Sequence, residues 1–144
     1  MTPISEPNFP FQIALRIDWS EMDLFGHVNN VMYFKYIQAS RVNYWEQTGI
    51  GKDFNSTGIA PILASTKCDF KKPLHYPGSL TIKVRMEFIK TTSFGFEHQL
   101  LNENGEIVAI AHDVMVMYDF NKNEKIIFPI ELKTEIEKIE GRKF

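Results

Sequence analysis

The 144-residue sequence has a single cysteine, no long apolar run and almost no excess charge. The single cysteine, Cys68, excludes an intrachain disulfide framework and is typical of a reducing compartment, so we expect a cytoplasmic protein. No stretch approaches the roughly 20 apolar residues that span a bilayer, and residues 1–10 lack the features of a secretion signal. A formal net charge of −2, with both signs interspersed, indicates neither a nucleic-acid nor a membrane partner.

Two chemical signatures are also missing from the sequence. No Gly-x-Ser-x-Gly motif is present, which argues against a serine thioesterase of the α/β-hydrolase type. His75, His98 and His112 show no metal-ligand spacing, so we predict no metal and no cofactor and interpret them as turn or strand residues. Cys68 has no histidine beside it in the sequence, and we expect it to be a small buried apolar residue rather than a nucleophile.

The length of the chain fits one domain. We predict a flexible N-terminal segment over residues 1–10 and a single domain over residues 11–144. Alternating apolar and polar residues predict five strands, at residues 11–18, 62–70, 80–88, 94–101 and 107–118. The dipeptide Asn104-Gly105 indicates a hairpin between the last two strands, and residues 76–79 indicate a turn before the third.

Two helices complete the expected secondary structure. Residues 30–47 predict one long helix that ends at Gly49, and Pro129 predicts the start of a last helix. The order of elements indicates an α+β fold in which an antiparallel sheet wraps around the long central helix. Apolar residues extend beyond one stripe of that helix, and one sheet covers only part of it. We therefore expect at least a homodimer, which would also protect the sheet edges.

The segment just before the long helix carries the residues best suited to chemistry. Residues 23–33 read Asp-Leu-Phe-Gly-His-Val-Asn-Asn-Val-Met-Tyr, with a carboxylate, a turn glycine, a histidine and two asparagines. A helix that begins after such a segment offers unpaired backbone N–H groups and the positive end of its dipole next to a carboxylate. Acyl transfer needs this combination of groups.

The order of elements together with this segment resembles the hotdog-fold thioesterases, specifically the 4-hydroxybenzoyl-CoA thioesterase-like branch of the acyl-CoA hydrolases. The pattern of that family is an aspartate, two variable positions, a glycine, then often His-Val-Asn-Asn and an aromatic residue. The matching positions are Asp23, Gly26, His27, Val28, Asn29, Asn30 and Tyr33. Some members have an aspartate and a proline where this chain has Glu21 and Leu24, so the acyl preference stays open.

The resemblance implies hydrolysis of an acyl-CoA thioester to the free acid and CoA. It makes Asp23 the nucleophile or the general base toward water, and the N–H near Asn30 the donor that polarises the thioester carbonyl. The resemblance also places the pantetheine arm in a groove between subunits. His27, Asn29 and Tyr33 become substrate-binding candidates, and Lys90 matches a phosphate-binding position.

Each of these residues also has a purely structural interpretation. Asp23 can satisfy backbone donors in a turn, and His27 can hold that turn together. Asn29 and Asn30 are both suited to cap the helix. Tyr33 fits the core or a dimer contact, and Lys71 and Lys72 are either solvated strand residues or substitutes for Lys90.

Two rival functions remain open at this point. The first is a thioesterase that acts on acyl groups carried by acyl carrier protein. The second is a non-catalytic hotdog module that binds acyl-CoA without hydrolysing it. The sequence also leaves open whether the assembly is a homodimer or a homotetramer.

Overall fold

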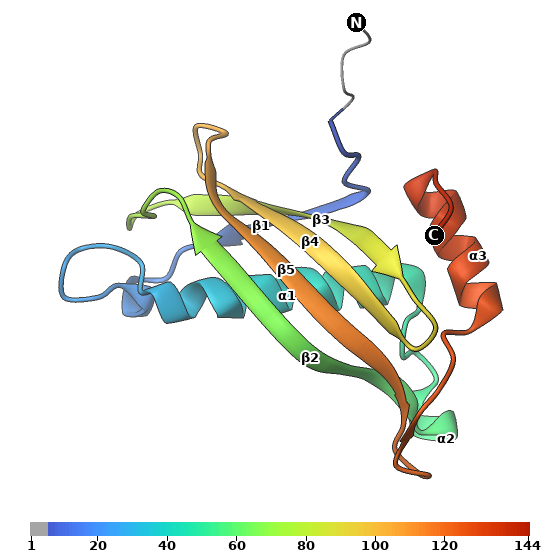
Figure 1. The fold of residues 1–144 in the computed structure, drawn as a ribbon. Helices are drawn as coiled ribbons and strands as arrows, with labels where there is room; N and C mark the ends of the chain where they lie inside the picture. Colours follow the sequence, from blue (N-terminus) through green and yellow to red (C-terminus); the bar gives the residue numbers. More distant parts are fainter. Residues whose placement is uncertain (1–5) are drawn as a thin grey trace, which may run out of the picture.

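The computed structural model describes residues 6–144, so residues 1–5 of the expected flexible segment lie outside the described part. A six-stranded sheet, antiparallel throughout, curls around one long helix (Figure 1). Its strands are β1 Phe11–Arg16, β2 Ile59–Phe70, β3 Ser79–Ile89, β4 Ser93–Leu101, β5 Ile107–Asp119 and the short β6 Glu124–Lys125. Their order is β1-β3-β4-β5-β2, with β6 paired to β5. The predicted α+β fold is confirmed.

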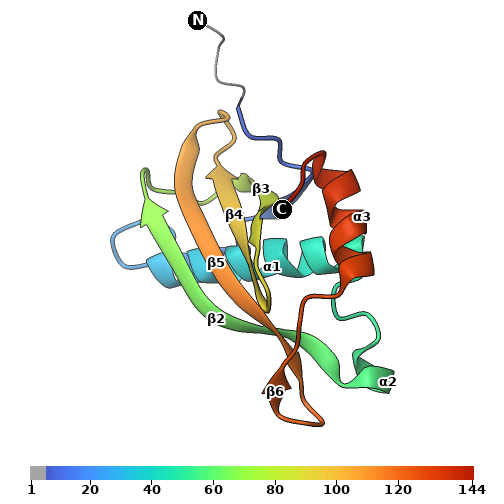
Figure 2. The same ribbon diagram turned by 45° about the vertical axis from the view of Figure 1, so that its right-hand side comes forward.

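The central helix α1 spans Asn30–Thr48 and lies in the concave face of the sheet (Figure 1). Its predicted end is confirmed, because Gly49 adopts a left-handed conformation with φ of 83° and its N–H bonds to the carbonyl of Trp45. The last helix, α3 Ile130–Glu140, begins directly after Pro129 and packs beside the C-terminal half of α1 (Figure 2). Among residues 6–144, no helix is both long and apolar enough to cross a membrane.

Two short helical turns were not predicted from the sequence. The 3-10 turn η1, Trp19–Glu21, follows β1 and is capped by the side chain of Asp18. The short helix α2, Phe54–Thr57, follows the end of α1. Both lie in connections without apolar periodicity, and only η1 has a side-chain cap at its start.

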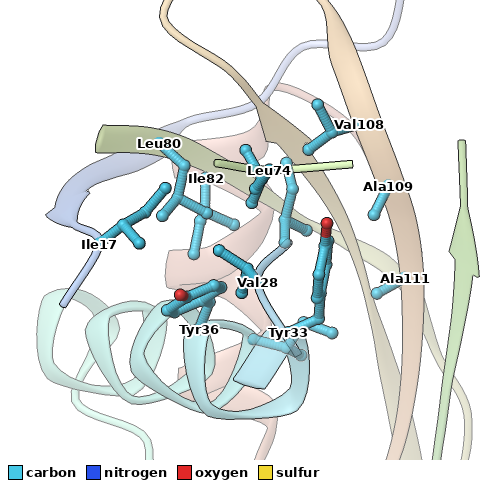
Figure 3. Close-up of a cluster of buried hydrophobic side chains, with 12 residues drawn as sticks. Ile17, Val28, Tyr33, Tyr36, Leu74, Leu80, Ile82, Val108, Ala109 and Ala111 are labelled. Atoms are coloured by element: carbon cyan, nitrogen blue, oxygen red, sulfur yellow. The ribbon is translucent and has the colours of Figure 1, made fainter. Parts of the chain in front are cut away.

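The apolar core forms two clusters along α1. The first gathers beneath the N-terminal half of α1 and includes Val28, Tyr33 and Tyr36 (Figure 3). The second contains Tyr44, Phe94 and Phe96 and is extended by Ile136 of α3. Each cluster therefore supports one end of α1.

Part of α1 is left uncovered by its own sheet. Val31, Phe34 and Val42 are apolar but exposed, at 56%, 36% and 36% of their full accessible surface. The edge strand β2 is exposed from residue 62 to residue 67. The sequence predicted this incomplete cover of the helix by a single sheet.

Candidate active site

The loop of residues 22–29 is closed at its base by backbone pairing. Met22 and Val28 form an antiparallel bridge, and the N–H of Asp23 donates to the carbonyl of His27 at 2.8 Å. Gly26 has a φ of 85°, a conformation that side-chain-bearing residues rarely adopt. The N–H of Val28 bonds to the carbonyl of Leu74 at 2.9 Å, which ties the loop to the chain between β2 and β3.

The carboxylate of Asp23 is held by its own loop. Its Oδ1 accepts hydrogen bonds from the N–H of Phe25 at 2.9 Å and from the N–H of His27 at 3.3 Å. The structural interpretation of Asp23 is therefore confirmed, because it satisfies donors in a turn. Its Oδ2 has no hydrogen-bond partner among residues 6–144, so one oxygen orients the group and the other remains available.

The first turn of α1 lies next to this carboxylate in the chain. Asn29 is the N-cap, and its side chain accepts a hydrogen bond from the N–H of Val31 at 3.0 Å. Asn30 is the first helical residue, and its N–H has no acceptor within the described part of the chain. The predicted capping role thus belongs to Asn29, and Asn30 supplies an unpaired donor at the positive end of the helix dipole.

A cleft of about 350 Å³ brings most of the predicted residues together. Its lining consists of Asp23, His27, Val28, Asn30, Tyr33, Phe70, Lys71, Lys72 and Pro73. A carboxylate, an unpaired helix N-terminus and two lysines therefore share one surface depression. Such a group of residues suits an anionic substrate with a carbonyl to be polarised.

Tyr33 and His27 form two sides of the cleft in different ways. The ring of Tyr33 is buried and meets the ring of Phe70 edge-on with centroids 5.0 Å apart. Its hydroxyl donates to the carbonyl of Lys72 at 3.5 Å, and burial raises its pKa. His27 is exposed, and its ring lies edge-on to that of His75 at 4.9 Å. Tyr33 is thus both a core residue and a wall of the cleft.

The lysines are divided between the two ends of the molecule. Lys71 and Lys72 are exposed at the cleft, where Lys72 also forms an ion pair with Glu106. Lys90 follows β3 at the opposite end of the sheet, and its Nζ lies 4.9 Å from the ring centroid of Phe88. It lines a different depression beside the start of α3, so a single chain does not bring Lys90 to Asp23 (Figure 1).

Cys68 lies outside the lining of the cleft and is an unreactive thiol. It packs against the first core cluster, and burial together with the nearby Asp69 carboxylate raises its pKa to about 11. A thiol that stays protonated at neutral pH is a poor nucleophile. The expectation of a small apolar residue is thus supported by its surroundings.

A second polar cluster lies deep in the core and was not predicted. Ser40 Oγ lies 2.9 Å from His98 Nδ1, and His98 Nε2 lies 2.7 Å from Asp113 Oδ2. Arg41 bonds to both oxygens of Asp113, at 3.0 and 3.2 Å, and Thr66 donates to Oδ1 at 2.9 Å. Burial alone would raise the pKa of Asp113, but the bonds from His98 and Arg41 hold it below its usual range.

The serine, histidine and aspartate of this cluster have the connectivity of a hydrolase triad, but substrate cannot reach them. Ser40, His98 and Asp113 are all 0% exposed. The cluster therefore joins α1 to β4, β5 and β2 inside the core. One sequence signal places His98 there, since it shares the alternation of Phe96 and Leu100 on the buried face of β4.

Comparison with known proteins identifies the family of the chain. The family model of the thioesterase-like superfamily matches residues 17–136. The chain belongs to the thioesterase-like superfamily. The predicted family is confirmed, and the protein is a thioester hydrolase.

Several relatives of this thioesterase have been described. It is 22% identical to the long-chain acyl-CoA thioesterase FadM of Escherichia coli, with 89% of this chain and 98% of FadM covered. It is 26% identical to the chloroplastic acyl-acyl carrier protein thioesterase ATL3 of Arabidopsis thaliana, with 86% and 66% covered. A thioesterase from Thermus thermophilus, solved with coenzyme A and zinc, superimposes with a TM-score of 0.83. That pair is 22% identical over 94% of this chain and 98% of the other, and the likeness confirms the hotdog fold.

Proposed function

We propose that this thioesterase hydrolyses acyl-CoA, with residues 11–144 acting as its single domain. The proposal rests on one observation, that the Asp23 carboxylate and the free N–H of Asn30 lie in the same cleft. The thioester carbonyl oxygen would accept a hydrogen bond from Asn30. A preorganised donor of this kind contributes about 3–4 kcal/mol to transition-state stabilisation.

With this arrangement, Asp23 can hydrolyse the thioester by either of two mechanisms. As a nucleophile, its free oxygen attacks the carbonyl carbon and the C–S bond breaks. CoA leaves as a thiolate that water protonates, and a second water hydrolyses the resulting anhydride. As a general base, Asp23 takes a proton from water, the hydroxide attacks the carbonyl carbon, and the tetrahedral intermediate expels the thiolate. A positioned base contributes about 10²–10⁴-fold, and both routes yield the free acid and CoA.

The remaining cleft residues would bind the substrate. Tyr33 forms an apolar wall and His27 supports the loop, while Asn29, which lies outside the lining of the cleft, caps the helix start beside it. Lys71 and Lys72 offer positive charge to the CoA phosphates, since an ammonium binds phosphate as a point charge without strict geometry.

Lys90 would reach the cleft from a second subunit. Strand β2 is an exposed edge that runs from Ile59, at the end of the sheet near Lys90, to Phe70 in the cleft. Antiparallel pairing of two copies of β2 about a twofold axis would place Lys90 of the partner subunit at the end where Asp23 lies. We therefore propose a homodimer, or a homotetramer built from such dimers, and a monomer at micromolar concentration in light scattering would contradict the shared site.

The test is thiol release from short-chain, long-chain and aromatic acyl-CoA, with the same acyl groups on acyl carrier protein measured in parallel. Turnover of at least one acyl-CoA supports the proposal. Turnover on the carrier protein alone would instead favour the first rival, for which the relationship to ATL3 gives specific support. A rise in melting temperature with acyl-CoA but no turnover would favour the non-catalytic module, because ligand binding to the native state alone stabilises it.

A further inference from the structure

Glu21 is a buried carboxylate at the base of the loop that carries Asp23. Only 4% of its surface is exposed, although it is the last residue of a short surface turn. Its Oε1 accepts hydrogen bonds from the N–H of Asp18 at 2.7 Å and from the hydroxyl of Tyr36 at 3.0 Å. Its Oε2 pairs with the ammonium of Lys35 at 2.9 Å. Both oxygens are therefore engaged, and two of the three donors belong to α1.

The main chain of Glu21 is linked to the other side of the same loop. Its carbonyl accepts a hydrogen bond from the N–H of Asn29 at 2.9 Å, one residue before the unpaired donor of Asn30. Its neighbour Met22 forms the bridge to Val28 that closes the loop. Glu21 thus connects the turn that leads to Asp23, the residue before Asn30, and the first turns of α1.

The partner of Glu21 on α1 is itself held firmly. Tyr36 is 2% exposed and packs within the first core cluster. Figure 3 shows its ring among the buried side chains of that cluster. A side chain locked in the core gives the carboxylate a fixed point of attachment.

We infer that Glu21 is a positioning residue that sets the Asp23 carboxylate against the N–H of Asn30, an inference that rests on the proposed function. The loop has few other attachments to α1, because Leu24 and Phe25 are 94% and 83% exposed. A displacement of about 1 Å between reacting groups lowers rates by about 10²-fold, so a misplaced loop base should reduce turnover more than substrate binding.

The negative charge of Glu21 is needed for this positioning role. Burial alone would raise its pKa, but the hydrogen bonds from Asp18, Lys35 and Tyr36 hold it below its ordinary range. The carboxylate is therefore ionised at neutral pH and can accept from all three donors. A glutamine in its place would turn an N–H₂ group toward one of these donors.

The experiment compares Glu21→Gln with Glu140→Gln in the intact protein. Glu140 is a matched control, because it is 6% exposed and accepts a hydrogen bond from another tyrosine of α1, Tyr44, at 2.7 Å. It lies at the opposite end of α1, away from the cleft. Two readouts are used, kcat and KM for acyl-CoA at equal folded concentration, and hydrogen exchange of the backbone amides in residues 22–29.

We expect Glu21→Gln to lower kcat about tenfold or more, with KM changed less than threefold, and to speed amide exchange in the loop. Glu140→Gln should leave both readouts at the wild-type level. Wild-type kcat and loop exchange in Glu21→Gln would overturn the inference. A fall in kcat shared equally by both variants would also overturn it, because a general loosening would then explain the loss.

Two further variants keep the inference testable if Glu21→Gln does not fold. Tyr36→Phe and Lys35→Met each remove one donor to Glu21, with Tyr44→Phe as the control for the first. Each should lower kcat severalfold and loosen the loop, and wild-type values in both would overturn the inference. If the wild-type protein hydrolyses no thioester, the proposed function fails, and the exchange measurement still decides whether Glu21 fixes the loop.

Discussion

The two ends of α1 are built differently, although each carries a buried tyrosine–glutamate pair. At the N-terminal end, Tyr36 bonds to Glu21 beneath an exposed loop with Asp23 and an unpaired helix N-terminus. At the C-terminal end, Tyr44 bonds to Glu140 of α3, which also accepts the N–H of Met86 at 2.6 Å. At the C-terminal end the glutamate joins α1 to α3 and β3, whereas the cleft end keeps polar groups free. On the proposed function, the chemistry is carried by one end of the helix and the second tyrosine–glutamate pair stabilises the other.

The tyrosine–glutamate pairs also differ in their electrostatics. Lys35 stands beside Glu21, and the pKa of Glu21 is lowered despite its burial. At Glu140, burial outweighs the hydrogen bonds from Met86 and Tyr44 and the more distant arginines, so its pKa is raised. Hydrogen bonds from Asp18, Lys35 and Tyr36 thus outweigh burial at Glu21, whereas burial dominates at Glu140.

The largest effect on stability should arise in the middle of α1, at the buried ion pair of Arg41 and Asp113. Asp113→Ala leaves Arg41 and His98 in the core without their common partner. Loss of one member of a buried pair costs about 3–5 kcal/mol of unfolding free energy. Urea denaturation measures the loss, and kcat per folded molecule should stay close to wild type. A loss below about 1 kcal/mol would show that the cluster does not stabilise the core.

A smaller loss of unfolding free energy is expected at the C-terminal end of α1. Tyr44→Phe removes a hydrogen bond to the buried carboxylate of Glu140, worth about 1.5–3 kcal/mol. The thermal unfolding midpoint should fall while kcat stays unchanged. A fall in kcat would show that the C-terminal end of α1 is coupled to the cleft, so that the two ends of the helix do not have separate roles.

The pH dependence of stability should separate the two glutamates. Because the pKa of Glu21 is lowered in the folded state, its contribution is complete above the unfolded pKa and is lost as pH falls toward the folded pKa. Glu140 has a raised pKa, so its contribution is present at low pH and is lost as pH rises through the folded pKa.

Urea titrations of the glutamine variants from about pH 3 to about pH 8 measure this difference. Relative to wild type, Glu21→Gln should become less stable as pH rises, whereas Glu140→Gln should become relatively more stable. Parallel curves for the two variants would contradict the assigned electrostatics.

The smallest effect is expected at the tip of the cleft loop. Leu24 is 94% exposed, so Leu24→Ser removes almost no buried surface and should change the unfolding free energy by less than about 0.5 kcal/mol. Chemical denaturation checks this value. A loss above about 1 kcal/mol would mean that the loop is packed in solution, for example against a second subunit.

Much of the fold could be predicted because it follows from local patterns. The strand alternation and the cap at Gly49 depend only on neighbours in the sequence. The segment from Asp23 to Asn30 was found for the same reason, since its carboxylate, turn and helix start are contiguous. The Asn29 cap and the turn around Asp23 then lie as predicted.

What could not be predicted depends on the pairing of distant segments. Glu21 meets Tyr36 only because η1 folds back onto α1, and Asp113 meets Arg41 across 72 positions of sequence. The alternation of β5 puts Asp113 on the same buried face as Ala111 and Met115, but it does not identify Arg41 as the partner. Nothing in the sequence around Glu21 distinguishes a buried carboxylate from a solvated one. In the proposed dimer, the position of Lys90 relative to Asp23 depends further on how the two chains associate, which no periodicity within one chain encodes.

The most direct test of the account is the rate of acyl-CoA hydrolysis by Asp23→Asn against wild type, at equal folded concentration and with acyl-CoA binding measured in parallel. Asparagine keeps an oxygen for the turn N–H groups of Phe25 and His27 but lacks the free carboxylate oxygen. We expect a fall in kcat of about 10²–10⁴-fold, with binding and stability retained. A variant that binds acyl-CoA and hydrolyses it at the wild-type rate would contradict the role of Asp23.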